Sequence, residues 1–326
     1  MTNLNKKLIW TILLGIIVLI AVTFMADFKN TVAALREFKT VYLPLILGLT
    51  FINYLLRFAK WHYFLKLIDV SVSLKESFMI FLCGLAMTVT PGKAGELLKS
   101  LLLKELKGVA VSRTAPVVFV ERLSDGFGLI VLSLSGIAFF KYGAEALLII
   151  TGVLASFVLV IKTPRLCTLL IRACSKIPIL NKFTGILEAL MHSAGQLMTL
   201  QSLLFTVIIS IVSWSFESVA FYYVFVGLGY KVSLVVATFT LAFSSIIGSI
   251  SMLPGGLGAA EGSIMGLLVK VAGVPQNIAA VATILIRFCT LWFGVTIGLL
   301  AIVSNRQLIK YVNRMGPDSE QKEAVR

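Results

Sequence analysis

Long apolar runs separated by short polar stretches set the pattern of this chain. Each of the longer runs is close to the roughly 20 residues that an α-helix needs to cross a lipid bilayer. These runs cover residues 8–25, 41–59, 115–140, 145–161, 203–228 and 278–303. The pattern predicts an all-α polytopic membrane protein with about six full transmembrane spans.

Two further apolar regions are interrupted by helix breakers. Residues 77–103 are broken at Thr90-Pro91-Gly92, and residues 234–272 are broken at Pro254-Gly255-Gly256. Proline removes a backbone donor and glycine leaves the helical conformation easily, so a helix ends at such a pair. Each region is therefore predicted to be a hairpin of two short helices.

The amino-acid composition also indicates a membrane protein. Of the 326 residues, 58% are hydrophobic and 13% are charged, whereas soluble domains are roughly 45–50% apolar and about 25% charged. The formal net charge of +14 would suggest nucleic acid in a soluble protein. Here the basic residues fall between apolar runs, where they orient the chain and contact anionic headgroups. We expect membrane lipids and no nucleic acid as partners.

The basic residues also predict how the chain threads the cell membrane, because Lys and Arg of short loops collect on the cytoplasmic side. They crowd the N-terminus, the stretches 60–75 (from Lys60), 99–113 (from Lys99) and 162–182, and the C-terminal tail. If 60–75 and 99–113 are both cytoplasmic, the hairpin between them enters and returns. The weakly charged loops 229–233 and 273–277 place the second hairpin on the opposite face. Both termini are predicted to be cytoplasmic.

The two hairpins belong to an internal repeat. The run 90–96 resembles 253–261, and an arginine follows each hairpin at a similar distance, Arg122 in the first half and Arg287 in the second. Inverted repeats with broken helices are the layout of many secondary transporters. Chance similarity between glycine-rich breakers is the alternative reading.

The repeat divides the chain into five parts. They are residues 1–40 with the first span and an outer loop, 41–161 with the hairpin 77–103, 162–202 as a cytoplasmic linker with an interfacial amphipathic helix, 203–305 with the hairpin 234–272, and a disordered cytoplasmic tail 306–326.

Ionisable residues inside apolar runs are costly and are functional candidates by default. Glu121 and Asp125 share one face of a predicted span, with Arg122 displaced by about 100° around the helix. Arg287 is the counterpart in the second half, and Glu217 lies inside the span 203–228. Glu217 has two readings, an ion pair with one of these arginines or a direct transport role. For Arg57 we favour snorkelling to the headgroup region.

The hairpin tips add anion-seeking groups, because a helix that restarts after a break points free N–H groups and a positive dipole end at its surroundings. Glu96 and Glu261 fall in the first turns of the returning helices, where plain capping is the alternative. With two anion-seeking tips and two intramembrane arginines, we expect a site for a phosphate-bearing headgroup. Its candidate residues are Arg122, Arg287, Glu121, Asp125, Lys93, Glu96, Glu261, Glu217, Pro91, Gly92, Gly255, Gly256 and Gly258.

No cofactor, metal or catalytic residue is predicted. The four cysteines form no CxxC pair, and the two histidines, His62 and His192, lie far apart near predicted membrane edges. Neither pattern is typical of a metal centre.

The motifs Pro91-Gly92-Lys93-Ala94-Gly95-Glu96, Glu121-Arg122-Leu123-Ser124-Asp125 and Pro254 to Glu261 occur in that order. In them the chain resembles, from about residue 8 to 305, the flippase-like family of the transmembrane region of lysylphosphatidylglycerol synthase, the multiple peptide resistance factor, which includes UPF0104-type membrane proteins. The resemblance implies movement of a lipid between leaflets. The soluble domain that makes the aminoacylated lipid in that factor has no counterpart here, so aminoacyl transfer is not expected.

Three functions stay open at this point. The leading one is a transporter or flippase of an anionic lipid or lipid-linked intermediate, and not an enzyme. The second is a membrane enzyme that acts on a lipid phosphate, with Glu121 and Asp125 on a divalent cation. The third is a regulatory or scaffolding subunit of a lipid or glycan synthesis complex. Transport is either proton-coupled, through Glu121, Asp125, Glu217 or Glu261, or downhill.

Overall fold

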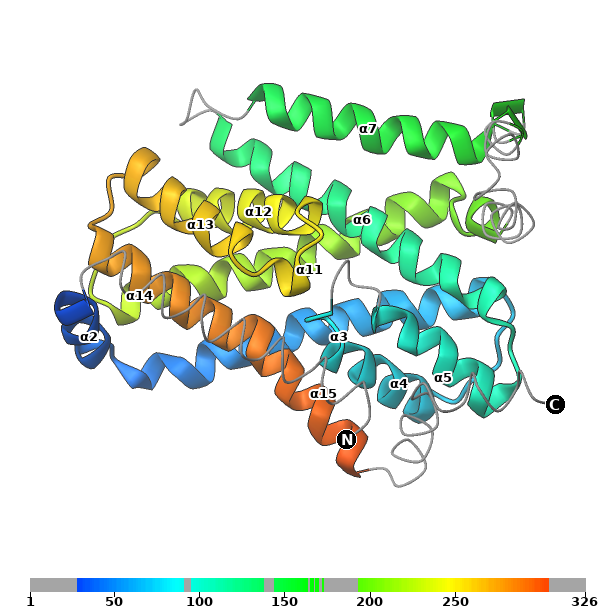
Figure 1. The fold of residues 1–326 in the computed structure, drawn as a ribbon, viewed down its shortest axis with the longest axis horizontal. Coiled ribbons are helices and arrows are strands. Elements are labelled where there is room, and N and C mark those ends of the chain that lie inside the picture. Colours follow the sequence, from blue (N-terminus) through cyan, green and yellow to red (C-terminus); the bar gives the residue numbers. More distant parts are fainter. Residues whose placement is uncertain are drawn as a thin grey trace, which may run out of the picture.

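A computed structural model of the chain describes residues 28–90, 95–137, 144–163 and 193–304, together with Arg165, Leu166, Thr168, Leu169 and Arg172. Among these residues every regular element is helical and none is a strand (Figure 1). In chain order the main elements are α2 (Phe28–Glu37), η1 (Thr40–Tyr42), α3 (Leu43–Leu67), α4 (Leu74–Ala86), α5 (Leu98–Lys107), α6 (Val111–Ile137), α7 (Ala144–Lys162), α11 (Leu200–Gly227), α12 (Leu234–Ile250), η3 (Pro254–Gly256), α13 (Ala259–Gly266), η4 (Leu267–Val271), α14 (Gln276–Arg287), η5 (Phe288–Trp292) and α15 (Phe293–Ser304).

Long helices form where the apolar runs predict them. In the described part of the chain, three continuous helical stretches are long and apolar enough to cross a bilayer: Thr40–Leu67, Leu200–Gly227 and Gln276–Ser304. The predicted spans 115–140 and 145–161 correspond to α6 and α7. The run 8–25 lies outside the described residues. The described part of the chain is thus all-helical, as predicted, and its long apolar helices agree with a membrane protein.

The first broken region folds as two short helices. A capping box starts α4, in which the Ser73 hydroxyl accepts from the backbone N–H of Glu76 and the Glu76 carboxylate accepts from that of Ser73. The helix ends at Ala86, and α5 begins at Leu98 and stops at Gly108, whose φ is +68°. An ion pair of 2.9 Å between Lys107 Nζ and Glu76 Oε1 joins the end of α5 to the start of α4. The hairpin therefore begins and ends at the same end of the molecule.

The second broken region has the same form. The Ser233 hydroxyl caps α12, which runs to Ile250, and α13 starts at Ala259 after the η3 turn. At this turn Gly256 has a φ of +67°, and a Cβ added to it would lie 3.0 Å from the Cα of Gly248. Only glycine fits both the left-handed conformation and the close approach between the turn and α12.

The breaks of the two hairpins lie next to each other. A Cβ added to Gly255 would lie 3.5 Å from Cγ1 of Val89, which follows α4. In Figure 1 the α4–α5 hairpin (cyan) and the α12–α13 hairpin (yellow) reach the middle of the molecule from opposite ends. Two segments about 165 residues apart in sequence thus form one central feature.

The two predicted halves of the chain pack across each other. α3 lies along α11, α6 contacts both α11 and α12, and α4 packs against α15. Small residues allow the closest contacts: a Cβ on Gly298 of α15 would lie 2.6 Å from the carbonyl oxygen of Leu82 on α4, and one on Gly128 of α6 would lie 2.8 Å from Cβ of Ser210 on α11. Each half therefore contributes to the core of the other.

The distribution of polarity is that of a protein in lipid. Large apolar side chains such as Leu148 and Ile149 on α7 and Val303 on α15 are exposed, at 72%, 67% and 68%. Polar side chains such as Thr50, Asn53 and Ser210 are fully buried. Water would penalise this arrangement, whereas hydrocarbon favours it.

Two lysines that the sequence analysis assigned to cytoplasmic loops are instead buried in helices. Lys60 is 0% exposed within α3, which continues to Leu67, and Lys99 is 2% exposed in the first turns of α5. That assignment is wrong because buried carboxylates on α6 hold both ammonium groups inside the bundle. Other basic residues at this end, among them Lys66, Lys104 and Arg113, are exposed as expected.

Three predicted segments lie largely or wholly outside the described residues. They are the interfacial helix in the linker 162–202, the tail 306–326 and the N-terminal part of 1–40. Near the end of this linker, Ala194 and Leu197 are described, and both are buried against the core.

Candidate functional site

The α6 carboxylates anchor a buried network of charges. Asp125 forms an ion pair with Lys60 of α3, and its Oδ1 also accepts a hydrogen bond of 3.0 Å from the hydroxyl of Ser210 on α11. The ammonium group of Lys60 donates further to the Ser210 hydroxyl, at 2.8 Å, and to the carbonyl oxygen of Glu121, at 3.3 Å. Three helices are joined at this point.

Glu121 is held in the same way from α5. Its Oε2 lies 2.7 Å from Nζ of Lys99, and that ammonium group sits 4.4 Å from the ring centroid of Trp61, in cation–π geometry. Glu121 is completely buried. A buried carboxylate persists in its charged form when cations compensate it, as here.

Arg122 closes the network. Its guanidinium lies 2.9 Å from Oε1 of Glu121, 3.3 Å from Oδ2 of Asp125 and 3.1 Å from Oε2 of Glu96. Acidic side chains from α6 and from the first hairpin therefore surround this arginine. The 100° offset around α6 does not separate Arg122 from its neighbours, because the long side chain bends back to them.

The second half repeats part of this arrangement. Nε of Arg287 lies 2.6 Å from Oε1 of Glu261, and its Nη2 donates to the carbonyl oxygen of Gly255 at 2.6 Å. In both halves a glutamate after the break thus pairs with an arginine 26 residues further along, Glu96 with Arg122 and Glu261 with Arg287. The shared pairing supports the internal repeat.

Glu261 also caps its own helix. Its Oε2 accepts a hydrogen bond of 2.7 Å from the backbone N–H of Gly258, while Oε1 binds Arg287. Glu261 therefore both caps α13 and binds Arg287. The free N–H expected at this tip is therefore partly used by the chain itself, and the arginines are left as the main anion-binding groups.

Arg57 is the least neutralised cation of the network. It is 8% exposed, its Nε lies 4.0 Å from Oδ2 of Asp125, and this nitrogen has no hydrogen-bond acceptor among the described residues. Asp125 is already shared by Lys60 and Arg122. The snorkelling favoured for Arg57 is wrong, because the side chain turns into the bundle.

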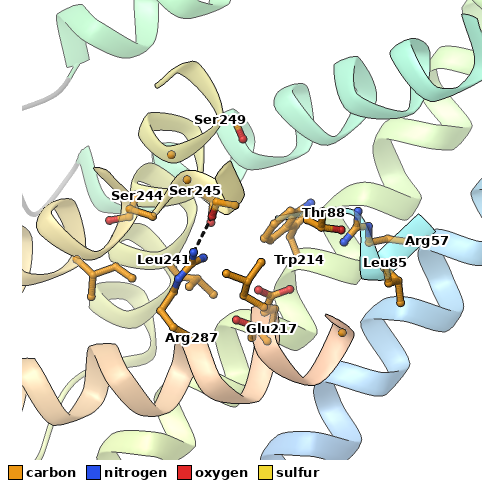
Figure 2. A pocket seen from close by; sticks show the side chains of 18 of the residues that line it. Arg57, Leu85, Thr88, Trp214, Glu217, Leu241, Ser244, Ser245, Ser249 and Arg287 are labelled. Carbon is orange, nitrogen blue, oxygen red and sulfur yellow. Dashed lines mark hydrogen bonds between the residues drawn. The ribbon is translucent and has the colours of Figure 1, made fainter. Parts of the chain in front are cut away.

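A cavity of about 110 Å³ lies between the two hairpin breaks. Arg57, Arg122 and Arg287 line it, together with Glu217, and its wall includes Thr88 beside the first break and Gly255 and Gly256 at the second. Figure 2 shows Arg287 and Arg57 reaching the cavity from different helices, with Glu217 between them and serine side chains of α12 along one wall. The volume holds several water molecules or a small polar group.

Glu217 does not pair with either arginine of the repeat. It is 7% exposed on α11, and within the described residues its carboxylate makes no ion pair or hydrogen bond. The ion-pair reading of this residue is not what the structure shows.

Part of the first tip lies outside the described residues, namely Pro91, Gly92 and Lys93. The flanking residues are ordered by Thr90, whose hydroxyl donates to the carbonyl oxygen of Met87 and accepts from the backbone N–H of Gly95, both at 2.7 Å. At the second tip, Gly255 and Gly256 line the cavity, whereas Gly258 serves as the N-cap of α13.

A second possible use of the carboxylates, as metal ligands, has no support in the donor set. Glu121 and Asp125 already bind Lys60, Lys99 and Arg122. The described part of the chain contains no cluster of three His, Cys, Asp or Glu residues that could hold a metal ion.

Comparison with known proteins agrees with the site motifs. Residues 12–298 match the family described as the lysylphosphatidylglycerol synthase TM region. The chain belongs to this family. It is similar to a UPF0104 membrane protein of Methanothermobacter thermautotrophicus, at 24% identity over 89% of this chain and 93% of the relative. A UPF0104 membrane protein of Pyrococcus horikoshii is 22% identical over 91% of this chain and 97% of its own length.

Membership of this family confirms the resemblance and establishes a membrane protein. Several residues of the site were nevertheless missed from sequence, namely Arg57, Lys60, Lys99 and Ser210. One signal for two of them was available. Thr50, Asn53, Arg57 and Lys60 recur at helical spacing on one face of α3, and all four are buried.

The buried network predicts a large effect of removing one carboxylate. Asp125→Asn leaves Lys60 without its anion, and breaking a buried pair costs about 3–5 kcal/mol. We expect a clear fall in the thermal unfolding temperature of the purified protein in detergent. The double variant Lys60→Met/Asp125→Asn removes both charges and is expected to recover part of the loss.

Asp69→Asn, at an exposed turn, is the matched control and is expected to unfold like the unmodified protein. Unfolding of Asp125→Asn at the unmodified temperature, or a double variant as unstable as the sum of its parts, would contradict the role assigned to the pair.

Proposed function

We propose that this protein moves an anionic, phosphate-bearing lipid between the leaflets of the cell membrane. The observation that carries the proposal is that Arg57, Arg122 and Arg287 line one cavity between the two hairpin breaks. Membership of a family of lipid metabolism agrees with a lipid substrate. The substrate is expected to be a phospholipid or a lipid-linked intermediate with a phosphate group.

The lining of the cavity suits a phosphate. Guanidinium groups bind phosphate oxygens through two parallel charge-assisted hydrogen bonds. Arg122 and Arg287 are oriented by Glu96 and Glu261, so little side-chain entropy remains to be lost on binding. Arg57, whose charge is least compensated, is proposed as the first contact of the headgroup.

The surroundings of the cavity suit acyl chains. Ile250, Met252 and Leu253, at the tip of the second hairpin, are exposed at 58%, 68% and 44%, directly before the cavity residue Gly255. Phe288, the neighbour of Arg287, is 60% exposed. A lipid whose headgroup enters the cavity can leave its chains along this apolar surface, which a soluble anion would not use.

Transport, and not catalysis, is the proposed activity. The carboxylates of α6 serve to orient cations. The π-helical turn η5 directly follows Arg287, and such turns often occur at functional sites. Residues that orient charges around a small cavity support binding and release of a headgroup without bond cleavage.

We further propose that the hairpins are re-entrant and enter the membrane from opposite faces. Their shared geometry and the pairing of Glu96 with Arg122 and of Glu261 with Arg287 support an inverted repeat. With α6, α7 and the run 8–25 as spans, the chain has about six crossings, and both termini face the cytoplasm. A central site between inverted halves can open to each face in turn.

This topology predicts which positions share a face. In a variant without native cysteines, Lys66→Cys and Lys104→Cys flank the first hairpin, whereas Lys231→Cys precedes the second and Lys270→Cys lies at its end; all four positions are exposed. We expect a membrane-impermeant maleimide added to intact cells to label the second pair and not the first. Labelling of only one member of either pair would show that its hairpin crosses the membrane.

Lipid movement is the direct test of the function. Liposomes that contain the protein and phosphatidylglycerol with a fluorescent NBD group are quenched from outside by dithionite, which reports movement between leaflets. We expect Arg57→Ala to slow this movement about tenfold or more, because a hydrogen bond to a charged group contributes about 1.5–3 kcal/mol. Arg57→Lys should retain part of the rate.

Arg36→Ala, on the exposed face of α2, is the matched control and should leave the rate unchanged. Equal movement with unmodified protein and Arg57→Ala would contradict the proposed site. Equal movement in liposomes with and without protein would contradict the function itself.

A further inference from the structure

Glu217 differs from the other buried carboxylates of the central region. Glu96, Glu121, Asp125 and Glu261 each form an ion pair with a lysine or arginine. Glu217 is also buried, at 7% exposed, and lines the cavity, yet its carboxylate has no such partner in the described part of the chain. A buried, unpaired carboxylate is costly in its charged form, so it requires a reason.

The charged and titratable groups that face Glu217 come from the helices packed against α11. They are Tyr54 and Arg57 of α3, Arg122 and Asp125 of α6, and Arg287 of α14. α12, which also packs against α11, carries no titratable residue. The Tyr54 hydroxyl is occupied, because it donates to the carbonyl oxygen of Thr290 at 2.5 Å. Glu217 therefore depends on Arg57 and Arg287 for its electrostatic compensation.

These arginines are also the groups that an anion in the cavity would bind. An ionised Glu217 and an anionic headgroup then compete for the same positive charges, within a space of about 110 Å³. When the headgroup displaces water, two negative charges lie close together in a medium of low dielectric constant, where they repel strongly. A proton on Glu217 removes this repulsion and leaves both arginines for the headgroup.

We propose that Glu217 is a proton-binding site coupled to the cavity. It takes up one proton from water when an anionic headgroup enters, and returns it to water when the headgroup leaves. The inference rests on the proposed function and adds its energy coupling, since a lipid and a proton that bind together also cross together. Glu121, Asp125 and Glu261 are excluded from this role by their ion pairs.

Thermodynamic linkage between proton binding and headgroup binding determines how the affinity changes with pH. If headgroup binding favours the protonated carboxyl group, protonation must favour headgroup binding to the same degree. Affinity for the anion therefore rises as pH falls. Above the pH range in which Glu217 titrates, one linked proton corresponds to a loss of about tenfold in affinity per pH unit.

Calorimetry on the full chain in detergent tests the coupling. The probe is dioctanoyl phosphatidylglycerol, a phosphodiester without a titratable proton near neutral pH, and titrations in buffers of different ionisation enthalpy count the protons taken up. We expect uptake approaching one proton per bound lipid for the unmodified protein. Glu217→Gln, which mimics the protonated group, should bind the probe with no uptake and with an affinity independent of pH.

Glu217→Asp keeps a carboxylate and should retain the uptake, as should Glu145→Gln, an exposed carboxylate on α7. Binding by the unmodified protein without proton uptake, or unchanged uptake in Glu217→Gln, would overturn the inference while leaving an anion-binding cavity and the proposed function intact. Absence of binding by the unmodified protein would overturn both.

Discussion

The structure depends on one constraint, that charges buried among apolar helices must be neutralised by other buried charges. Lys60 and Asp125 meet this constraint between α3 and α6, and Lys99 and Glu121 between α5 and α6. Because one missing partner leaves a charge that costs several kcal/mol, these pairs fix how the helices lie against one another. The hairpin α4–α5 and the long helix α6 are thereby held in register, and the position of the cavity follows.

The same constraint explains the shape of the site. Each half supplies a broken hairpin and an arginine held by a glutamate, and crossed packing of the halves brings both breaks to one place. Carboxylates near Arg122 and Arg287 orient these two side chains. Arg57 has a weaker partner, since its Nε lies 4.0 Å from Oδ2 of Asp125. The result is a polar cavity lined by Arg57, Arg122, Arg287 and Glu217, with exposed apolar side chains next to it. An anion in this cavity and an ionised Glu217 would share the same arginines.

Much of the fold could be predicted from sequence because it rests on local signals. Apolar length predicted the helices α3, α11 and α14–α15, and Pro-Gly pairs predicted the breaks. The arginines of the repeat were also found, since a charge inside an apolar run is visible without a structure. Lys60 and Lys99 were misplaced for the opposite reason. Each lies near the end of an apolar run, and only its partner on α6, distant in sequence, decides whether it is buried or exposed.

The contacts of the site were beyond sequence for the same physical reason. Glu217 stands in an apolar span like Glu121, and nothing local shows that one is paired and the other is not. Likewise, the role of Gly256 as a close contact for Gly248 depends on how a turn folds back on its own helix. Contacts between helices depend on how the helices pack, and local sequence patterns do not determine that packing.

The proposed headgroup site consists of buried arginines from both halves of the chain, between the hairpin breaks. A cryo-electron microscopy map of the protein in nanodiscs containing phosphatidylglycerol, with a bound antibody fragment to aid alignment, tests it most directly. We expect density for a lipid phosphate within hydrogen-bonding distance of Arg57 and of Arg122 or Arg287, with acyl chains along Met252 and Leu253. A cavity that contains only water, with every ordered headgroup at the membrane surface, would contradict it.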